Sequence, residues 1–557
     1  MAAAASVDSR QPVGETDGDD DSALEENEDN EIIDPCLTDE GTDENISQGI
    51  PLETIVNMHR PVSYIENMEE IQSKDFIFMI SPFKYDPLHP ERKPTANCIQ
   101  NRRSNLSDVD HVLMPYSKFN VTKNKRSIWA FNREALIILK TMCDNHTATF
   151  NDFKDTIRKC MHSHCELGSL EQLINEVYSN EERGHFMSIV LSNICNRALD
   201  VDKICGQSPP LLCSGSNRSV TMSQEQVASL LACSVFCLYP MRSEQKAKNQ
   251  YRNFPNPNFN LLYKSGHPRK IQKLKCIFHY FRRVTENMPT GVITIQRVVL
   301  PKAYFPRWSE VKTDLCDLHL TTGQKIEDIP SVLQIDFANK YIGGGVLGSG
   351  CVQEEIRFSI CPEMLVSLLI CEKMEPNECI FLIGCERYSS YKGYADSFQY
   401  GGNYDDNTPK DNWGRKWCHV VAMDAIYFRH ASTQYDMHCV DRELLKAYTS
   451  FIPLKYGSDY MFGIATGNWG CGAFNGDKYL KAIIQLMAAS AAGRPLIYAA
   501  YRDKVLVNAF YIVYEFLKDQ KATVSDLYRY LQRYFSQGER QSLFDYILST
   551  PVSSLKS

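Results

Sequence analysis

The spacing of apolar residues divides the chain near residue 290. From about 126 to 290, apolar side chains recur every three or four positions, as at Ala135, Leu136, Ile138 and Leu139. A helix with this spacing presents one apolar face to a protein core. The pattern therefore predicts a helical accessory domain over 126–290. The same spacing recurs at Leu170, Leu173, Ile174 and Val177, at Val227, Leu230, Leu231 and Val235, and in a last helix from Lys270 to Arg283.

Beyond Met288 the pattern changes to short apolar runs, which are typical of buried strands. Helical spacing returns between several of these runs, and this alternation predicts an α/β layer fold with a substantially parallel sheet over 291–557. Ligands of such sheets bind beyond the carboxyl ends of the strands. Strands are expected at Gly291–Leu300, Val332–Phe337, Cys379–Gly384, Val420–Phe428, Met461–Thr466 and Leu496–Tyr501, and helices at Val440–Phe451, Lys478–Ala492 and Lys504–Lys518.

The first part of the chain lacks both patterns. Residues 1–50 contain 16 acidic residues and one basic residue, Arg10. Such a segment cannot bury enough apolar surface to offset the entropy of ordering it, so we expect it to be disordered. Residues 51–125 are rich in proline and irregular, and we expect them to wrap around the body. The whole chain has a net charge of −8, so the body carries a positive surplus, which suits an anionic ligand but equally fits a solvated surface.

Composition also excludes several classes of protein. No apolar run reaches the length of about 18 residues that a membrane helix needs, and the N-terminus lacks the basic and apolar parts of a secretory signal. The 20 cysteines are scattered, which is typical of thiols in a reducing compartment. The compact group from Cys160 to Cys165 lacks a second pair of ligands, so we expect a helix with two surface histidines there and no metal.

Two glycine-rich segments follow expected strands. The first contains Gly343, Gly344 and Gly345, and the second runs from Thr466 to Phe474 into a helix. Glycine allows a ligand to approach the backbone closely, and amides at a helix start attract anions, so together the segments could hold a pyrophosphate. Each alone could be a tight turn. Gly343, Gly345 and Gly348 also fit a dinucleotide pattern, but five residues separate the strand from the first glycine.

Carboxylates adjoin the first segment. Asp336 ends a strand, and Glu354 and Glu355 follow the glycines between apolar neighbours such as Val352 and Ile356. A random pair of glutamates usually lies on the surface, but partial burial at this place would raise a carboxyl pKa into the range of a general acid. Adjacent residues point in different directions, so we expect the two glutamates to have different roles.

These motifs together resemble those of poly(ADP-ribose) glycohydrolases. Three glycines, seven residues and then Gln353-Glu354-Glu355 are similar to that family's signature, and so are the segments 334–339, 465–474 and 393–395. The resemblance spans roughly residues 110–535. It implies an α/β fold with a macrodomain-like mixed sheet flanked by helices, and an accessory N-terminal helical domain. It also implies hydrolysis of ribose–ribose bonds in poly(ADP-ribose), with release of ADP-ribose.

The resemblance further implies roles for individual residues. Glu355 would be the acid and base, with Asp336 and Glu354 as catalytic neighbours. Tyr501 would stack on the adenine; the family more often has Phe there, and both residues stack. The remaining substrate contacts implied are Ile326 and Glu327 at the adenine edge, Asn339, Gly343, Gly344, Gly345 and Gln353 at the riboses and phosphates, Tyr394, and Asn468, Trp469, Gly470, Cys471, Gly472, Ala473 and Phe474 around the pyrophosphate.

The partner implied is poly(ADP-ribose) on modified proteins, with no cofactor or metal, no reading of nucleic-acid sequence, no membrane and a monomeric enzyme. A role in the DNA damage response, in the nucleus, the cytoplasm or both, is expected on the same ground. The basic cluster at 123–126 is too short to indicate nuclear targeting. Two alternatives remain: a binding module without catalysis, which would lack the acid, and a nicotinamide-dependent oxidoreductase, which would prefer NAD over ADP-ribose.

Overall fold

One mixed sheet of ten strands forms the centre of the protein. The expected parallel arrangement is confirmed for its middle, where β5, β12, β11, β6 and β10 run parallel, whereas β10, β7, β4 and β3 pair antiparallel. The strand order is β1 (Ser47–Gly49), β5 (Leu318–Thr321), β12 (Leu496–Ala499), β11 (Ile464–Gly467), β6 (Leu333–Ala338), β10 (His419–Asp424), β7 (Glu378–Ile383), β4 (Val292–Val299), β3 (Arg218–Ser223) and β2 (Phe76–Phe78). This computed structural model describes residues 45–58, 65–97, 110–122, 124–162, 165–242, 251–265, 267–454, 462–536 and 541–556.

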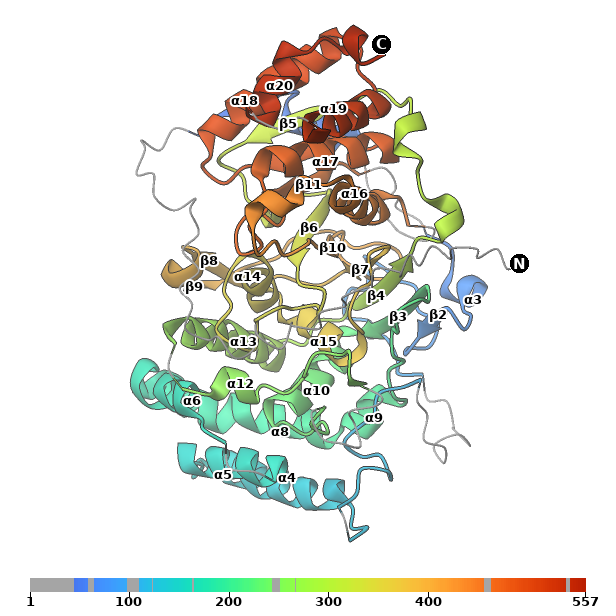
Figure 1. The fold of residues 1–557 in the computed structure, drawn as a ribbon. Coiled ribbons are helices and arrows are strands. Elements are labelled where there is room, and N and C mark those ends of the chain that lie inside the picture. Colours follow the sequence, from blue (N-terminus) through green and yellow to red (C-terminus); the bar gives the residue numbers. More distant parts are fainter. Residues whose placement is uncertain are drawn as a thin grey trace, which may run out of the picture.

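The accessory region is helical, as its apolar spacing predicts. Its helices are stacked in layers below the sheet in Figure 1, with α4 and α5 outermost and α13 nearest the sheet. Its elements are α4 (Ile128–Asp144), α5 (Phe150–Met161), α6 (Gly168–Gln172), a π-helical turn (Leu173–Val177), α7 (Asn180–His185), a second π-helical turn (Phe186–Val190), α8 (Leu191–Leu199), α9 (Val201–Cys205), α10 (Gln224–Val235), α12 (Asn260–Tyr263) and α13 (Pro268–Glu286).

Further helices, from the α/β region over 291–557, cover the sheet. Those that follow β10 lie around the upper strands of the sheet in Figure 1, and α14 and α15 lie on the side of the accessory region. The elements are a 3₁₀ turn (Ile326–Asp328), α14 (Gln353–Ile360), α15 (Ser367–Ile370), a separate hairpin of β8 (Ser389–Lys392) and β9 (Gln399–Asn403), α16 (Met437–Phe451), α17 (Lys478–Ala492), α18 (Lys504–Asp519), α19 (Val524–Ser536) and α20 (Leu543–Ser549). None of the helices in the described ranges is long and apolar enough to cross a membrane.

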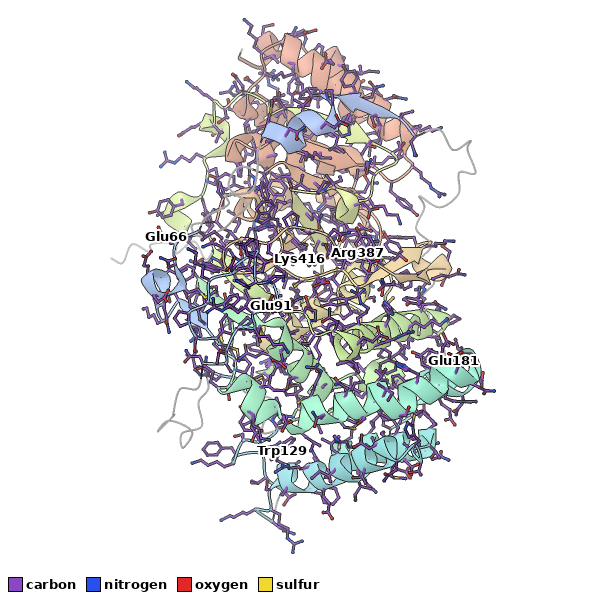
Figure 2. The ribbon with its side chains drawn as sticks, turned by 180° about the vertical axis from the view of Figure 1, so that it is seen from behind. Glu66, Glu91, Trp129, Glu181, Arg387 and Lys416 are labelled. Atoms are coloured by element: carbon purple, nitrogen blue, oxygen red, sulfur yellow. The ribbon has the colours of Figure 1, made fainter. Side chains whose placement is uncertain are left out.

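The accessory region and the α/β region over 291–557 share one core. A single cluster of buried apolar side chains extends from α4 through α10 and α13 to α14. In Figure 2, Trp129 lies on the outermost helical layer, whereas Arg387 and Lys416 lie in the middle of the molecule. The boundary expected near residue 290 therefore marks a change of secondary structure within a shared core, and β3 of the accessory region pairs with β4 across it.

Three details of the predicted pattern are wrong. Ile138 of α4 and Val177 of the first π-helical turn were expected in the core, but they are 52% and 37% exposed, because each element buries a narrower face than its sequence offers. The strand expected to reach Phe428 ends at Asp424, because the Ile426 amide then donates to the Glu443 side chain and leaves the ladder. The short segment that forms β3 was expected to be part of a helical region, and four of its six residues are polar.

The expected end of the disordered segment is also wrong. Residues 1–44 lie outside the described residues, but Ser47–Gly49 form β1, which pairs with β5. The following helix α2 (Leu52–Met58) buries Ile55 completely against the strands β11 and β12. Order begins before residue 50 because an open sheet edge and an apolar contact are available to these residues.

Candidate active site

The expected catalytic residues meet where β6 ends and α14 begins. The side chain of Gln353, the first residue of α14, is bonded to the backbone of β6 at two points. It accepts from the Phe337 amide at 2.8 Å and donates to the Ile335 carbonyl at 3.0 Å. This bonding extends the strand's hydrogen bonds onto the helix and fixes the helix start beside Asp336. The expected contact of Gln353 with riboses stays a prediction.

Glu354 and Glu355 bond different parts of the connection between β6 and α14, which we call the first glycine loop (339–352). Glu354 accepts from the amides of Asn339 at 2.9 Å and Gly343 at 2.6 Å. Glu355 accepts from the amides of Gly345 at 2.9 Å and Val352 at 2.8 Å. The adjacent glutamates therefore have different partners, as their placement on a helix predicts, and together they hold the loop at four points.

The loop requires glycine where it passes the glutamates. Gly344 has a φ of +48°, and a Cβ added there would lie 2.6 Å from one carboxylate oxygen of Glu354 and of Glu355. Gly350 is similarly confined, since its added Cβ would lie 2.9 Å from the Cα of Gly345. The glycines thus let backbone amides reach the carboxylates, which is a different use from a dinucleotide fingerprint, where the loop amides face the ligand.

Asp336 supplies the third carboxylate and shapes the electrostatics. It is fully buried, and neither of its oxygens has a hydrogen-bond partner among the described residues. Burial, and next the charge of Glu355, raise the Asp336 pKa well above its usual value. Burial, followed by the charges of Asp336 and Glu355, likewise raises the pKa of Glu354. Burial and the neighbouring negative charge therefore favour the neutral, protonated forms of Asp336 and Glu354.

A buried lysine of the accessory region contacts the same loop. Lys273, on α13, is fully buried, and its ammonium donates to the carbonyls of Gly345 at 3.2 Å, Gly348 at 2.8 Å and Gly350 at 2.5 Å. Burial lowers the pKa of Lys273 to about 8, while the neighbouring Cys351 and Glu355 act in the opposite direction. The sequence analysis missed this residue, although a lysine within an apolar helical stripe was a signal for it.

The connection from β11 to α17, the second glycine loop (467–476), leaves the sheet beside the first, because β11 and β6 are parallel neighbours. It is closed by short backbone bonds, such as that from the Gly476 amide to the Gly470 carbonyl at 2.8 Å. Gly470 has a φ of +73°, and a Cβ added there would lie 2.6 Å from the Cβ of Ala425. Asn468 accepts from the Tyr498 hydroxyl at 3.0 Å.

Most of the expected residues of the second glycine loop line the turn, but Trp469 is an exception. Its side chain is fully buried beneath the loop and donates to the Met423 carbonyl at 3.0 Å. The expected contact of Trp469 with a pyrophosphate could therefore come only from its backbone. Cys471, Gly472, Ala473 and Phe474 are partly exposed within the turn, as a ligand contact requires.

The residues expected at the adenine, together with the substrate contact expected at Tyr394, lie in two groups. The rings of Tyr394 and Tyr501 pack at 5.4 Å between centroids, and Tyr501, two residues after the end of β12, has a φ of +39°. Ile326 is buried, while Glu327 accepts a hydrogen bond from the Tyr391 hydroxyl. The Tyr394 segment is tied to the first glycine loop, because the Ala395 amide donates to the Cys351 carbonyl at 3.1 Å.

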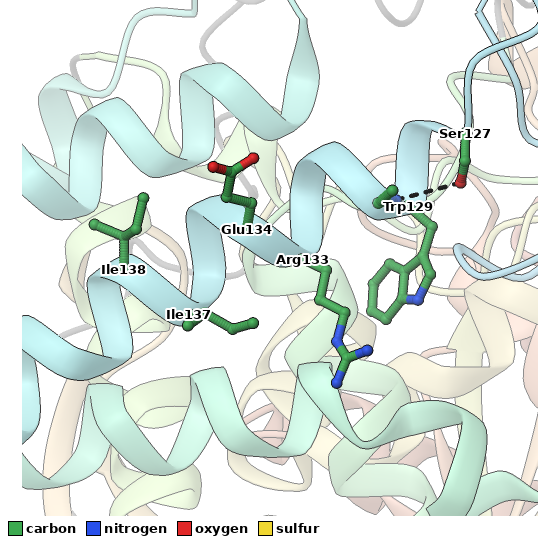
Figure 3. Close-up of a pocket in the computed structure, with 7 residues that line it drawn as sticks. Ser127, Trp129, Arg133, Glu134, Ile137 and Ile138 are labelled. Atoms are coloured by element: carbon green, nitrogen blue, oxygen red, sulfur yellow. Dashed lines mark hydrogen bonds between the residues drawn. The ribbon is translucent and has the colours of Figure 1, made fainter.

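A separate surface hollow lies away from these residues. It has a volume of about 450 Å³ on the outer face of α4 and includes Trp129, Arg133 and Ile137 (Figure 3). Among the residues that line this hollow, Glu134 alone is acidic, so the lining has no cluster of carboxylates. The acidic site at the sheet is thus the better candidate for chemistry. The described residues contain no cluster of ligands that could hold a metal ion.

Buried carboxylates beside a glycine loop, on a mixed sheet with a helical companion, define an α/β protein with a candidate acid–base site. Residues 305–508 match the family model described as poly(ADP-ribose) glycohydrolase, macro domain fold, and residues 178–297 match the model of that family's helical domain. The chain is 34% identical to the probable poly(ADP-ribose) glycohydrolase 2 of Arabidopsis thaliana, over 57% of this chain and 69% of the relative. It is 33% identical to poly(ADP-ribose) glycohydrolase 1 of the same plant, over 57% and 70%.

A relative in an animal shows the same similarity. Poly(ADP-ribose) glycohydrolase 1 of Caenorhabditis elegans is 33% identical, over 56% of this chain and 40% of the relative. The chain therefore belongs to the poly(ADP-ribose) glycohydrolase family, as its motifs indicate. The fold expected from that resemblance, a macrodomain-like sheet with a helical accessory region, is confirmed.

Proposed function

We propose that this chain hydrolyses the ribose–ribose O-glycosidic bonds of poly(ADP-ribose) and releases ADP-ribose, with Glu355 as general acid and base. Its membership of the family supports the reaction, and the geometry supports the residue. The observation that carries the proposal is the bonding of Glu355 between Gly345 and Val352, which fixes a carboxyl group at the start of α14 beside two other carboxyls.

Protonated Glu355 would donate its proton to the 2′ oxygen of the leaving ribose while the bond from that oxygen to the anomeric carbon breaks. The electron pair of the broken bond stays on the oxygen, and positive charge develops on the ribose ring that is cut. A water oxygen then bonds to the anomeric carbon, and the Glu355 carboxylate takes a proton from that water. The acid is thereby regenerated, and one carboxyl serves both steps, unlike the usual two-carboxylate scheme.

The other residues would bind and orient the substrate. The second glycine loop offers a turn at a helix N-terminus, where a pyrophosphate is favourable. Tyr501, packed on Tyr394, offers an aromatic face for the adenine. Glu354 orders the first glycine loop through Asn339 and Gly343. The bound pyrophosphate is negatively charged, so it would also stabilise the positive charge that develops on the ribose ring in the transition state.

The proposal is tested by incubating the protein with poly(ADP-ribose) of defined length and separating the products by chromatography. We expect ADP-ribose to accumulate from the first time points. Calorimetry with ADP-ribose and NAD provides the second arm, in which ADP-ribose should bind more tightly. Intact polymer after long incubation would leave a binding module, and preferred binding of NAD would favour an oxidoreductase.

A further inference from the structure

The first glycine loop is held from two opposite sides. On one side, its amides at Gly345 and Val352 donate to Glu355. On the other side, the carbonyls of Gly345, Gly348 and Gly350 accept from the ammonium of Lys273. Gly345 takes part in both sets of bonds, so one peptide segment connects the cation to the carboxylate.

The convergence on Lys273 is unusual in its chemistry. The lysine is fully buried, and its three described acceptors are neutral carbonyls. Three carbonyl dipoles that point at one buried ammonium satisfy all of its donors and would repel one another without it. The positive charge of the ammonium therefore stabilises the loop conformation in which these three carbonyls converge.

The groups around Lys273 add to this arrangement. Cys351 and Glu355 face it from the loop and from α14, and Lys270 and Arg269 face it from its own helix. Arg269 donates to Asp396 at 2.8 Å, which ties the segment after β8 to the same helix. Helix α13 thus supports both the loop that carries the glycines and the segment that carries Tyr394.

We propose that Lys273 is a positioning residue for the hydrolysis: its ammonium, supplied by the accessory region, holds the first glycine loop in the conformation that fixes Glu355. The inference rests on the proposed role of Glu355 as the acid. It assigns the helical region a part in the reaction, because the residue that orders the catalytic loop lies on α13. Lys273 touches no substrate and acts through the loop.

The first test compares Lys273→Met with Lys270→Met. Lys270 is also buried on α13 and donates to a carbonyl, that of Leu261 at 3.2 Å, within the accessory region. Both variants should lose stability, but Lys273→Met should lower kcat by about 100-fold, as small misplacements of a catalytic group do. Its KM and its Kd for ADP-ribose should change by less than about threefold. Equal kcat values in the two variants would overturn the proposal.

The second test uses pH and does not depend on the folding of Lys273→Met. In the unaltered enzyme, kcat should fall as pH rises through about 8, because the Lys273 ammonium, with its lowered pKa, then loses its proton. Lys273→Arg keeps the charge at every pH used, so whatever activity it retains should show no such fall. A fall near pH 8 that persists in Lys273→Arg would contradict the inference.

Including Glu355→Gln distinguishes a failure of the Lys273 proposal from a failure of the proposed role of Glu355. If Glu355→Gln retains turnover, the assignment of the acid fails, whatever Lys273 does. If Glu355→Gln is inactive but Lys273→Met turns over like Lys270→Met, the positioning role alone fails. Loss of turnover in both Glu355→Gln and Lys273→Met, with ADP-ribose binding preserved, is the expected result.

Discussion

The two glycine loops leave neighbouring parallel strands, but their bonds differ. In the first glycine loop, amides donate to Glu354 and Glu355, and carbonyls accept from Lys273. In the second, several backbone bonds close the turn on itself, and neutral groups from outside complete it, such as the Phe428 amide, which donates to the Phe474 carbonyl at 3.1 Å, and the Gln485 side chain, which donates to the Gly467 carbonyl at 3.0 Å. The lysine beneath the second loop, Lys481, is paired with the carboxylate of Glu443 and packs 4.0 Å from the centre of the Trp469 ring.

This difference separates two uses of glycine. The backbone of the first loop bonds to charged side chains, namely Glu354, Glu355 and Lys273, so the loop orders the carboxyl groups proposed for catalysis. The second loop is held by its own backbone bonds and by neutral donors from outside it, and Lys481 beneath it is paired with Glu443, which leaves a turn at a helix start for an anionic ligand. We therefore expect changes in the first loop to lower kcat, and changes in the second to weaken ADP-ribose binding.

The largest expected effect is that of Glu355→Gln. The amide keeps the size of the side chain but cannot deliver a proton, so turnover should fall by about 10²–10⁴-fold, the usual range for general acid catalysis. ADP-ribose binding, measured by calorimetry, should change far less because the second loop carries it. Glu354→Gln should lower turnover and also affinity, since Glu354 bonds the amides of Asn339 and Gly343, two residues expected to contact the substrate. Near-normal single-turnover cleavage by Glu355→Gln would move the acid to Glu354 or Asp336.

A matched pair of glycine substitutions tests the comparison directly. Gly344→Ala and Gly470→Ala both add a Cβ at positive φ, and in both the added atom would lie 2.6 Å from a neighbour. Gly344→Ala displaces carboxylates, so kcat should fall by about 10- to 100-fold. Gly470→Ala displaces the turn against Ala425, so the Kd for ADP-ribose should rise with a smaller change of kcat at saturation. The reverse pattern would show that the roles of the two loops have been exchanged.

Sequence reasoning accounts for much of this comparison. The strand–glycine–helix order located both loops, and the apolar neighbours of Glu354 and Glu355 correctly predicted that both are buried. It could not find Lys273, because the loop and α13 are about 70 residues apart along the chain and only packing brings them together. Trp469 was assigned to the ligand for a similar reason, since sequence does not say which way a loop side chain points.

A smaller effect is expected at Tyr501. Tyr501→Ala should weaken ADP-ribose binding by about tenfold, because an aromatic contact contributes roughly 0.5–1.5 kcal/mol beyond its buried area. Tyr501→Phe should bind almost normally, since stacking needs the ring and not the hydroxyl. Both variants keep a side chain at the positive φ of this position, so backbone strain is matched between them. Equal losses in the two, measured by calorimetry, would exclude stacking as the role of Tyr501.

The smallest effect is expected at the N-terminus. There, removal of the acidic segment can be compared with loss of the Ile55 contact, which supports β11 and the second loop. Removal of residues 1–44 should leave turnover and melting temperature almost unchanged, because this acidic segment has little apolar surface to bury.

Ile55→Ala is the contrasting change. Ile55 is fully buried beside Ala465 of β11, and a Cβ added at Gly463, just before β11, would lie 2.4 Å from its Cγ2. The cavity should lower the melting temperature and weaken ADP-ribose binding, whereas kcat at saturation should be preserved because the first loop is untouched. A fall in kcat without weaker binding would mean that α2 supports the catalytic loop instead, and a lower melting temperature after removal of 1–44 would show that the acidic segment packs on the body.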